Sequence, residues 1–200
     1  MSHLSYWSYT SYTDTMSNLL FTHGGYRNLK SFQTATIVYD LTVKFCDLYM
    51  SYKTNKSYRT YDQMVQAARS GRQNIAEGSQ ASGTSKKTEI KLVSVARASL
   101  EELLLDYEDY LRQHGLQLWE KDDPKAQVVR KLGYMSDRSY STYMSYMDQP
   151  QPAANCLICL IHQANYLLDR QLQALEKSLL DDGGFTERLY KKRTERRSTR

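Results

Sequence analysis

The sequence is poor in helix-breaking residues and in cysteine. Among its 200 residues are only 3 prolines, 9 glycines and 3 cysteines. So few breakers favour long helices, because a β-sandwich needs a turn about every ten residues. The small, odd number of cysteines argues against a disulfide framework and predicts a reducing compartment.

Long apolar runs are also absent. None approaches the roughly 18–20 residues that cross a membrane, and residues 1–25 lack the basic start and apolar stretch of a signal peptide. Hydrophobic residues make up 40% and charged residues 24% of the chain, as in globular proteins. We therefore expect a soluble cytoplasmic protein of one ordinary domain, with no membrane partner.

The net charge of +5 belongs to the C-terminal tail. Residues 187–200 contain seven basic and two acidic side chains, whereas the rest of the chain is neutral. Such a tail often serves solubility alone, but it is also the electrostatic footprint of nucleic-acid binding. Gly183-Gly184 precedes it, so residues 183–200 are predicted to be a hinge and a basic tail.

Apolar residues recur at helical spacing in the first third of the chain. The positions alternate three and four residues apart, and six of the seven are apolar; they are Leu29, Phe32, Thr36, Tyr39, Val43, Cys46 and Met50. This pattern predicts a helix over residues 28–51 that turns these positions to the core. The polar residues 51–57 are expected to form a loop.

Three further helices are expected. One begins at Thr60 or Asp62 and ends at the glycine-containing segment 78–83. The next begins at Thr84 or Ser85 and ends at Gly115. Their expected core positions are Met64, Val65, Ala68, Gly71 and Ile75 in the first, and Val93, Ala96, Leu100, Leu103, Tyr107 and Tyr110 in the second. Gly71 suggests a close approach of the two helices.

The last long helix follows Pro150 and ends at Gly183. Its apolar face consists of Leu157, Leu160, Ile161, Ala164, Leu168, Leu172, Leu175 and Leu179. Before it, residues 116–151 predict an insertion of two short helices, with Tyr140, Tyr143, Met144 and Met147 on one face. Tyrosine and methionine are enriched at protein interfaces, so this face suggests a protein-binding surface.

Four long amphipathic helices with short links predict an all-α fold. The expected architecture is an antiparallel up-down four-helix bundle over residues 26–182, with the insertion at 116–151. Residues 1–25, rich in Ser, Thr and Tyr, are expected to be a poorly ordered leader.

Candidate chemical sites are incomplete. Cys156-x-x-Cys159-x-x-His162 supplies fewer than the four ligands that zinc prefers, so the cysteines are better explained as core residues. A carboxylate metal site in the acidic segment 101–109 would need Glu-x-x-His pairs, and no histidine has a glutamate three residues before it. No nucleophile triad or phosphate-binding glycine loop is present. We therefore expect no enzyme activity, metal or cofactor.

Charge is separated along the middle of the sequence. Residues 59–97 carry a net charge of +4, and residues 101–109 carry −5. A helix dipole prefers the opposite arrangement. The separation suggests that copies of the chain associate and that the basic end of the bundle is available to phosphates, although an accidental distribution would look the same.

Several segments resemble a known family. They are Tyr26-Arg-Asn-Leu-Lys-Ser-Phe-Gln33, Gln66-Ala-Ala-Arg-Ser-Gly71, Asn74-Ile-Ala-Glu-Gly78 and Ala96-Arg-Ala-Ser-Leu-Glu-Glu-Leu103. With residues 155–171, they resemble the four-helix-bundle family of the 23S ribosomal-RNA intervening-sequence protein, over about residues 26–180. The insertion and tail look like the longer subgroup with a "four-helix-bundle suffix".

The resemblance implies a pentameric ring with a positively charged channel. A branch of similar fold, the accessory variability determinant of diversity-generating retroelements, binds nucleic acid and a reverse transcriptase. The implied function is that of a nucleic-acid-binding accessory factor, for RNA or DNA; the alternative is a protein–protein scaffold. The candidate nucleic-acid-binding residues are Arg69, Arg72, Lys86, Lys87, Lys91 and Arg97 in the motif region, and Lys191, Lys192, Arg193, Arg196 and Arg197 in the tail.

Overall fold

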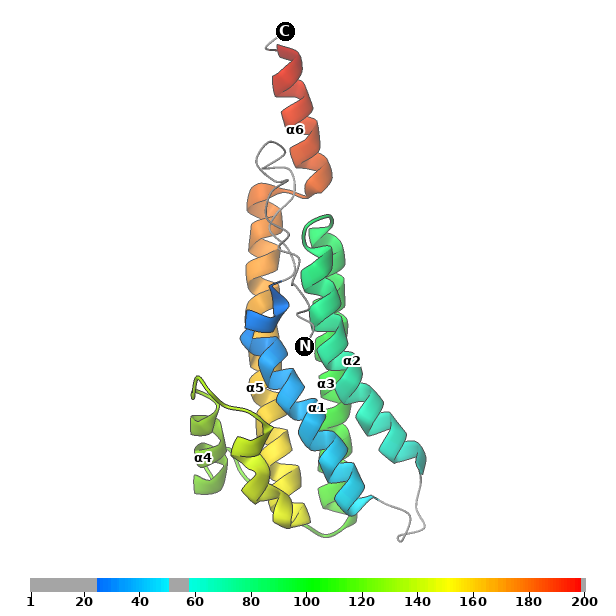
Figure 1. Ribbon diagram of the computed structural model, residues 1–200, viewed down its shortest axis with the longest axis vertical. Coiled ribbons are helices and arrows are strands. Elements are labelled where there is room, and N and C mark those ends of the chain that lie inside the picture. The colour runs from blue at the N-terminus through cyan, green and yellow to red at the C-terminus, as the bar shows by residue number, and fades with distance from the viewer. Residues whose placement is uncertain (1–24, 51–57, 199–200) are drawn as a thin grey trace, which may run out of the picture.

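The computed structural model describes residues 25–50 and 58–198 and shows an all-α protein over these ranges, with no strand (Figure 1). The elements are η1 (Tyr26–Asn28), α1 (Lys30–Tyr49), α2 (Tyr58–Ala81), α3 (Lys86–Gln113), α4 (Pro124–Leu132), η3 (Tyr140–Asp148), α5 (Pro150–Asp182) and α6 (Phe185–Ser198), where η marks a 3-10 helix. The expected leader up to residue 24 and the expected loop 51–57 lie outside the described residues. None of the described helices combines the length and the apolar character that crossing a bilayer requires.

Four long helices enclose the core. Each of α1, α2, α3 and α5 packs against two neighbours: α1 contacts α2 and α5, and α3 contacts the same two helices (Figure 1). Phe45, Leu100, Tyr107 and Leu157 are among the largest fully buried side chains between them. The insertion packs on one side through α4 and η3, both against α5. Helix α6 extends beyond the end of α5 and buries no residue (Figure 1).

The face that α1 turns to the core differs from the expected one. Of the seven positions in the expected stripe, only Cys46 is fully buried. The buried positions include Ala35, Thr42 and Phe45, which lie one residue earlier, or about 100° around the helix. Thr42 is stable there because Tyr107 donates a hydrogen bond to its hydroxyl (3.0 Å). The expected stripe therefore lies at the edge of the buried face, where Leu29, Phe32, Tyr39 and Met50 pack against the core but are only half-buried. The sequence did not reveal this shift, because the partner that makes Thr42 compatible with the core comes from another helix.

The pairing of α2 with α3 confirms most of the expected details. Ser85 caps α3 by accepting a hydrogen bond from the Thr88 amide (3.2 Å). A Cβ atom on Gly71 would lie only 2.7 Å from Leu100 Cδ2, so the predicted close approach is correct. The expected end of this helix within residues 78–83 is confirmed, because α2 continues through Gly78 and ends at Ala81. A glycine is tolerated inside the helix when tertiary packing offsets its lower propensity.

The apolar faces of α3 and α5 are confirmed where they cross the core. The fully buried members are Val93, Ala96, Leu100, Leu103 and Tyr107 on α3, and Leu157, Leu160, Ile161, Ala164 and Leu168 on α5. Gly115 ends the turn after α3 with a φ of +64°. Beyond Leu168, α5 projects past α1, so the last leucines of its expected face are only half-buried.

The insertion contains the expected two short helices, but one expected surface is wrong. Tyr143 and Met147 are buried, with 0% and 2% of their surfaces exposed. Tyr49 donates a hydrogen bond to the Met147 carbonyl (2.6 Å), which joins α1 to η3. Tyr143 and Met147 are therefore part of the core, since η3 packs against both α1 and α5. Met144 is half-buried, and of the four expected residues Tyr140 alone is exposed.

Candidate nucleic-acid interface

The candidate basic residues fall on three helices. Arg69 and Arg72 lie on α2, four others lie on the first half of α3, and five lie on α6. The start of α3 and the base of α6 occupy the same end of the molecule (Figure 1). Helix α6 follows α5, and the end of α5 lies beside the start of α3. The Lys86 ammonium on α3 donates a hydrogen bond there to the Ser178 carbonyl of α5 (3.2 Å).

Lys86 joins two helices rather than facing solvent. Only 7% of its surface is exposed. Its ammonium contacts both the carbonyl and the hydroxyl of Ser178. A buried ammonium needs such partners, because removing a charge from water is costly. Its neighbours Lys87 and Lys91 are exposed and lie four residues apart, so they share one face of α3.

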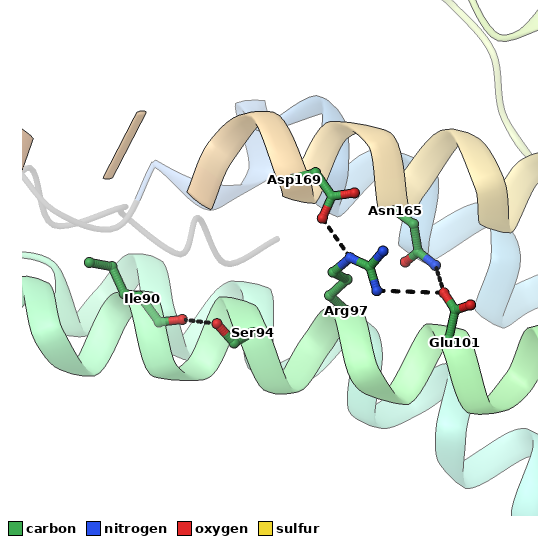
Figure 2. A network of polar contacts seen from close by, with 6 residues as sticks. All are labelled: Ile90, Ser94, Arg97, Glu101, Asn165 and Asp169. Carbon is green, nitrogen blue, oxygen red and sulfur yellow. Dashed lines mark hydrogen bonds and ion pairs between the residues drawn. The ribbon is translucent and has the colours of Figure 1, made fainter. Parts of the chain in front are cut away.

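Arg97 belongs to an interhelical network (Figure 2). Its Nε donates to Asp169 Oδ1 at 2.5 Å, and its Nη1 lies 3.6 Å from Glu101 Oε2. Asn165 donates to the same glutamate oxygen (2.9 Å). The hydrogen bond with Asp169 raises the pKa of the Arg97 guanidinium. Two carboxylates thus balance this charge, and the half-exposed pair with Asp169 is worth about 1 kcal/mol or less.

The two arginines of α2 have different surroundings. The Arg72 guanidinium lies over the Tyr39 ring, 4.2 Å from its centroid, which ties it to α1. Burial raises the pKa of the nearby Asp40, and the charge of Arg72 opposes that rise. Arg69 is exposed. Arg72 is therefore shared between a packing contact and the surface, whereas Arg69 faces water.

Helix α6 presents most of its basic side chains to solvent. Lys191, Arg193, Arg196 and Arg197 are exposed and Lys192 is half-buried. Gly183 ends α5 with a φ of +68°, a conformation in which glycine is favoured. The Glu187 carboxylate then accepts a hydrogen bond from the Gly184 amide (3.0 Å) at the start of α6.

The basic and acidic segments are not cleanly separated in space. Arg59 and Glu102 line the same shallow groove between α2 and α3. The groove also contains a hydrogen bond between the hydroxyls of Ser70 and Ser99 (2.9 Å), and Asn74 donates to the Ser70 hydroxyl (3.1 Å). Arg59 therefore lies beside the acidic segment, because α2 runs back along α3. Whether any of the eleven candidates binds nucleic acid stays a prediction.

The cysteines of α5 lie in an apolar environment. Cys156 is fully buried, which confirms that it is a core residue. Burial raises the pKa of Cys159 to about 11 and raises that of Cys156 further. Both are therefore protonated at neutral pH. Within the described part of the chain, no group of three or more His, Cys, Asp or Glu side chains could hold a metal ion.

Sequence reasoning missed the partners that engage the basic residues. Asp169 and Ser178 lie on α5, 72 and 92 residues from the side chains they bind. No local pattern marks them, because an aspartate or serine on a helix is usually a solvated residue.

Comparison with known proteins identifies a related family. Neither a search of curated proteins nor a search of solved structures found a similar protein. A family model does match the segment that runs from η1 through α3, whereas α4, α5 and α6 lie outside the match. Residues 27–114 of this chain are similar to the 23S rRNA-intervening sequence protein family.

Proposed function

We propose that the protein is a non-catalytic accessory factor that binds nucleic acid through α6 and the adjacent first turns of α3. The observation that carries the proposal is α6 itself, a helix with no buried residue and five basic side chains between positions 191 and 197. A helix that contributes nothing to the core is free to follow a phosphate backbone. The similarity of residues 27–114 to a family named for ribosomal RNA supports this choice of ligand.

The available cations are fewer than the sequence suggested. Arg97 is paired with carboxylates, and Lys86 is buried and hydrogen-bonded to Ser178, so neither side chain is available to a phosphate in this arrangement. Lys87, Lys91 and the α6 residues remain exposed or half-exposed at one end of the molecule. Binding through such residues releases counterions and is therefore steeply salt-dependent, with little reading of base sequence.

Neutralising α6 is expected to weaken nucleic-acid binding by at least about tenfold at physiological salt. The variant replaces Lys191, Lys192, Arg193, Arg196 and Arg197 with glutamine. Five lost phosphate contacts should reduce the slope of log K against log salt by roughly four, at 0.7–0.9 per contact. Fluorescence anisotropy with labelled single-stranded RNA and duplex DNA measures both quantities.

A control variant separates the site from net charge. It replaces five exposed basic residues outside α6 with glutamine: Lys44, Arg112, Lys125, Lys131 and Arg170. Both variants lose the same net charge, but only the first should lose affinity and salt slope. Equal losses in the two variants, or no binding by the unmodified protein at low salt, would contradict the proposal.

We further propose that α1, α2, α3 and α5 form an antiparallel up-down bundle that assembles into a pentamer. Two neighbours for each long helix support the bundle. The resemblance implies the ring, and the outer face of α3 offers apolar surface for it, since Val95 is 41% and Leu105 58% exposed.

A negative charge on the outer face of α3 is expected to dissociate the oligomer. Light scattering should give the unmodified protein five times the chain mass of 23.3 kDa and the Leu105→Glu variant a smaller assembly. Leu180→Glu, on the distal end of α5 and 85% exposed, is the matched control and should keep the full mass. A monomeric unmodified protein would exclude the ring.

A protein scaffold is the second candidate function. The observation in its favour is exposed tyrosine and methionine in the insertion: Tyr134 is 90%, Tyr140 51% and Met135 44% exposed. A reverse transcriptase is one partner that the resemblance suggests. Co-purification that returns a protein and no nucleic acid would favour this function over the first.

A further inference from the structure

A cavity of about 740 Å³ lies between the insertion and the long helices. Its walls come from α1, α3 and α5 on one side and from residues 118–138 on the other. Its volume falls within the range of small-molecule sites, which is about 300–1,000 Å³. None of the eleven basic candidates lines it, so it is separate from the proposed nucleic-acid interface.

Apolar and aromatic side chains form much of the lining. Ile158 and Trp119 are 5% and 9% exposed and belong to the core, whereas Tyr166 on α5 is 60% exposed and Leu118 is 43% exposed. The cavity therefore has a buried inner wall and a solvent-exposed rim. This arrangement suits a ligand with an apolar body and a polar group.

Positive charge exceeds negative charge around this cavity. Four basic side chains line it, from Lys30, Lys121, Arg130 and Arg138, against two acidic ones, from Glu108 and Glu120. An anionic group at the rim would balance the excess, because a cleft with low-dielectric walls focuses the field of its charges.

Two residues of the lining, Arg138 and Trp119, carry buried hydrogen-bond donors. Arg138 donates from Nη2 to the Thr34 hydroxyl on α1 (2.6 Å) and from Nη1 to the carbonyl of Gly133, which directly follows α4. These two hydrogen bonds fix the position of its guanidinium. Its Nε, and Nε1 of Trp119, make no hydrogen bond within the described residues. Unpaired buried donors are uncommon in native proteins, because a buried polar group without a partner is costly. Both atoms are closed off from solvent, so an acceptor in the cavity would reach them only if the lining shifted.

We infer that this cavity binds a small organic anion with an aromatic body. The apolar and aromatic walls take the ring system. The cationic rim, with Lys30 at the start of α1, takes the carboxylate, phosphate or sulfonate group.

Trp119 provides a direct readout. The chain has 2 tryptophans, so Trp7→Phe leaves Trp119 as the only one. We expect 8-anilinonaphthalene-1-sulfonate to quench the emission of Trp119 saturably, at one probe per chain. Its uncharged counterpart N-phenyl-1-naphthylamine should bind at least about tenfold more weakly, as expected from loss of one charge-assisted contact. Absence of saturable quenching, or equal affinity for the two probes, would overturn the inference.

Two surface variants test the location. Lys30→Glu and Tyr166→Ala alter the rim at exposed positions, and each should weaken binding of the anionic probe at least about tenfold. Lys44→Glu changes an exposed lysine on the same helix, away from the cavity, and should leave binding unchanged. Circular dichroism checks that all three variants are folded. If Lys44→Glu weakens binding as much as Lys30→Glu, the probe binds elsewhere and the inference is wrong.

Discussion

Replacing Gly71 with leucine is expected to destabilise the protein by about 3 kcal/mol or more. Gly71 is buried where α2 meets α3, and a Cβ atom there would lie 2.7 Å from Leu100 Cδ2 and 2.8 Å from its Cγ. Leu100 is itself fully buried, so it cannot move aside without displacing other core side chains. Urea denaturation measures the loss as a lower free energy of unfolding.

Alanine variants make this test specific, because α2 has two buried glycines that face α3. A Cβ on Gly78 would have its nearest neighbours at 3.4 Å, an ordinary contact distance. Gly78→Ala should therefore be neutral or stabilise the protein by up to about 1 kcal/mol through helix propensity. Gly71→Ala gains the same propensity and is nevertheless expected to destabilise. A Gly71→Ala variant as stable as Gly78→Ala would show that the helices are not in close contact at Gly71.

The Glu89→Gln variant is expected to remove a pH dependence from stability. Glu89 is 8% exposed, and burial raises its pKa to about 7 from an ordinary value of 4.5, although Lys86 opposes the rise. Between pH 4.5 and about 7 the folded protein therefore keeps Glu89 protonated, whereas the unfolded chain has released this proton. The stability that the protonated Glu89 contributes is complete below about pH 4.5 and is lost as pH rises through about 7, by at most about 3 kcal/mol.

Unfolding measured across this pH range tests the sign. Glu89→Gln should match the unmodified protein near pH 4.5 and exceed its stability near pH 8, because the glutamine is never charged. Glu176→Gln at an exposed position of α5 is the matched control and should follow the unmodified protein throughout. A Glu89→Gln variant that is less stable than the unmodified protein at pH 8 would show that the carboxylate is stabilised where it lies.

Local patterns predicted the helices better than their buried faces. The stripe of α3 was predicted correctly from Val93 to Tyr107 because leucine and valine mark a core face by themselves. The stripe of α1 was displaced by one residue, because the fully buried face includes Thr42, which is polar in the sequence and becomes compatible with burial through Tyr107.

In the candidate site, too, the sequence predicted some features and missed others. The sequence was sufficient to locate the charge of α6, because a run of basic residues with few apolar ones remains exposed in any fold. The sequence was not sufficient to predict that Lys86 and Arg97 have protein partners. In the sequence they cannot be distinguished from Lys91, which lies on the same helix and is exposed. Contacts with Ser178 and Asp169 distinguish them, and these residues come from α5.

The sequence by itself determined that the chain is helical, where the long helices stop, and that the excess positive charge is in the tail. These properties depend on the spacing of apolar residues, on glycine and proline, and on composition, all of which are local. Only the tertiary structure decided which cations are already paired, which glycine is tightly packed and where the insertion leaves a cavity. Each of these depends on atoms from helices far apart in the chain, whose distances no local pattern records.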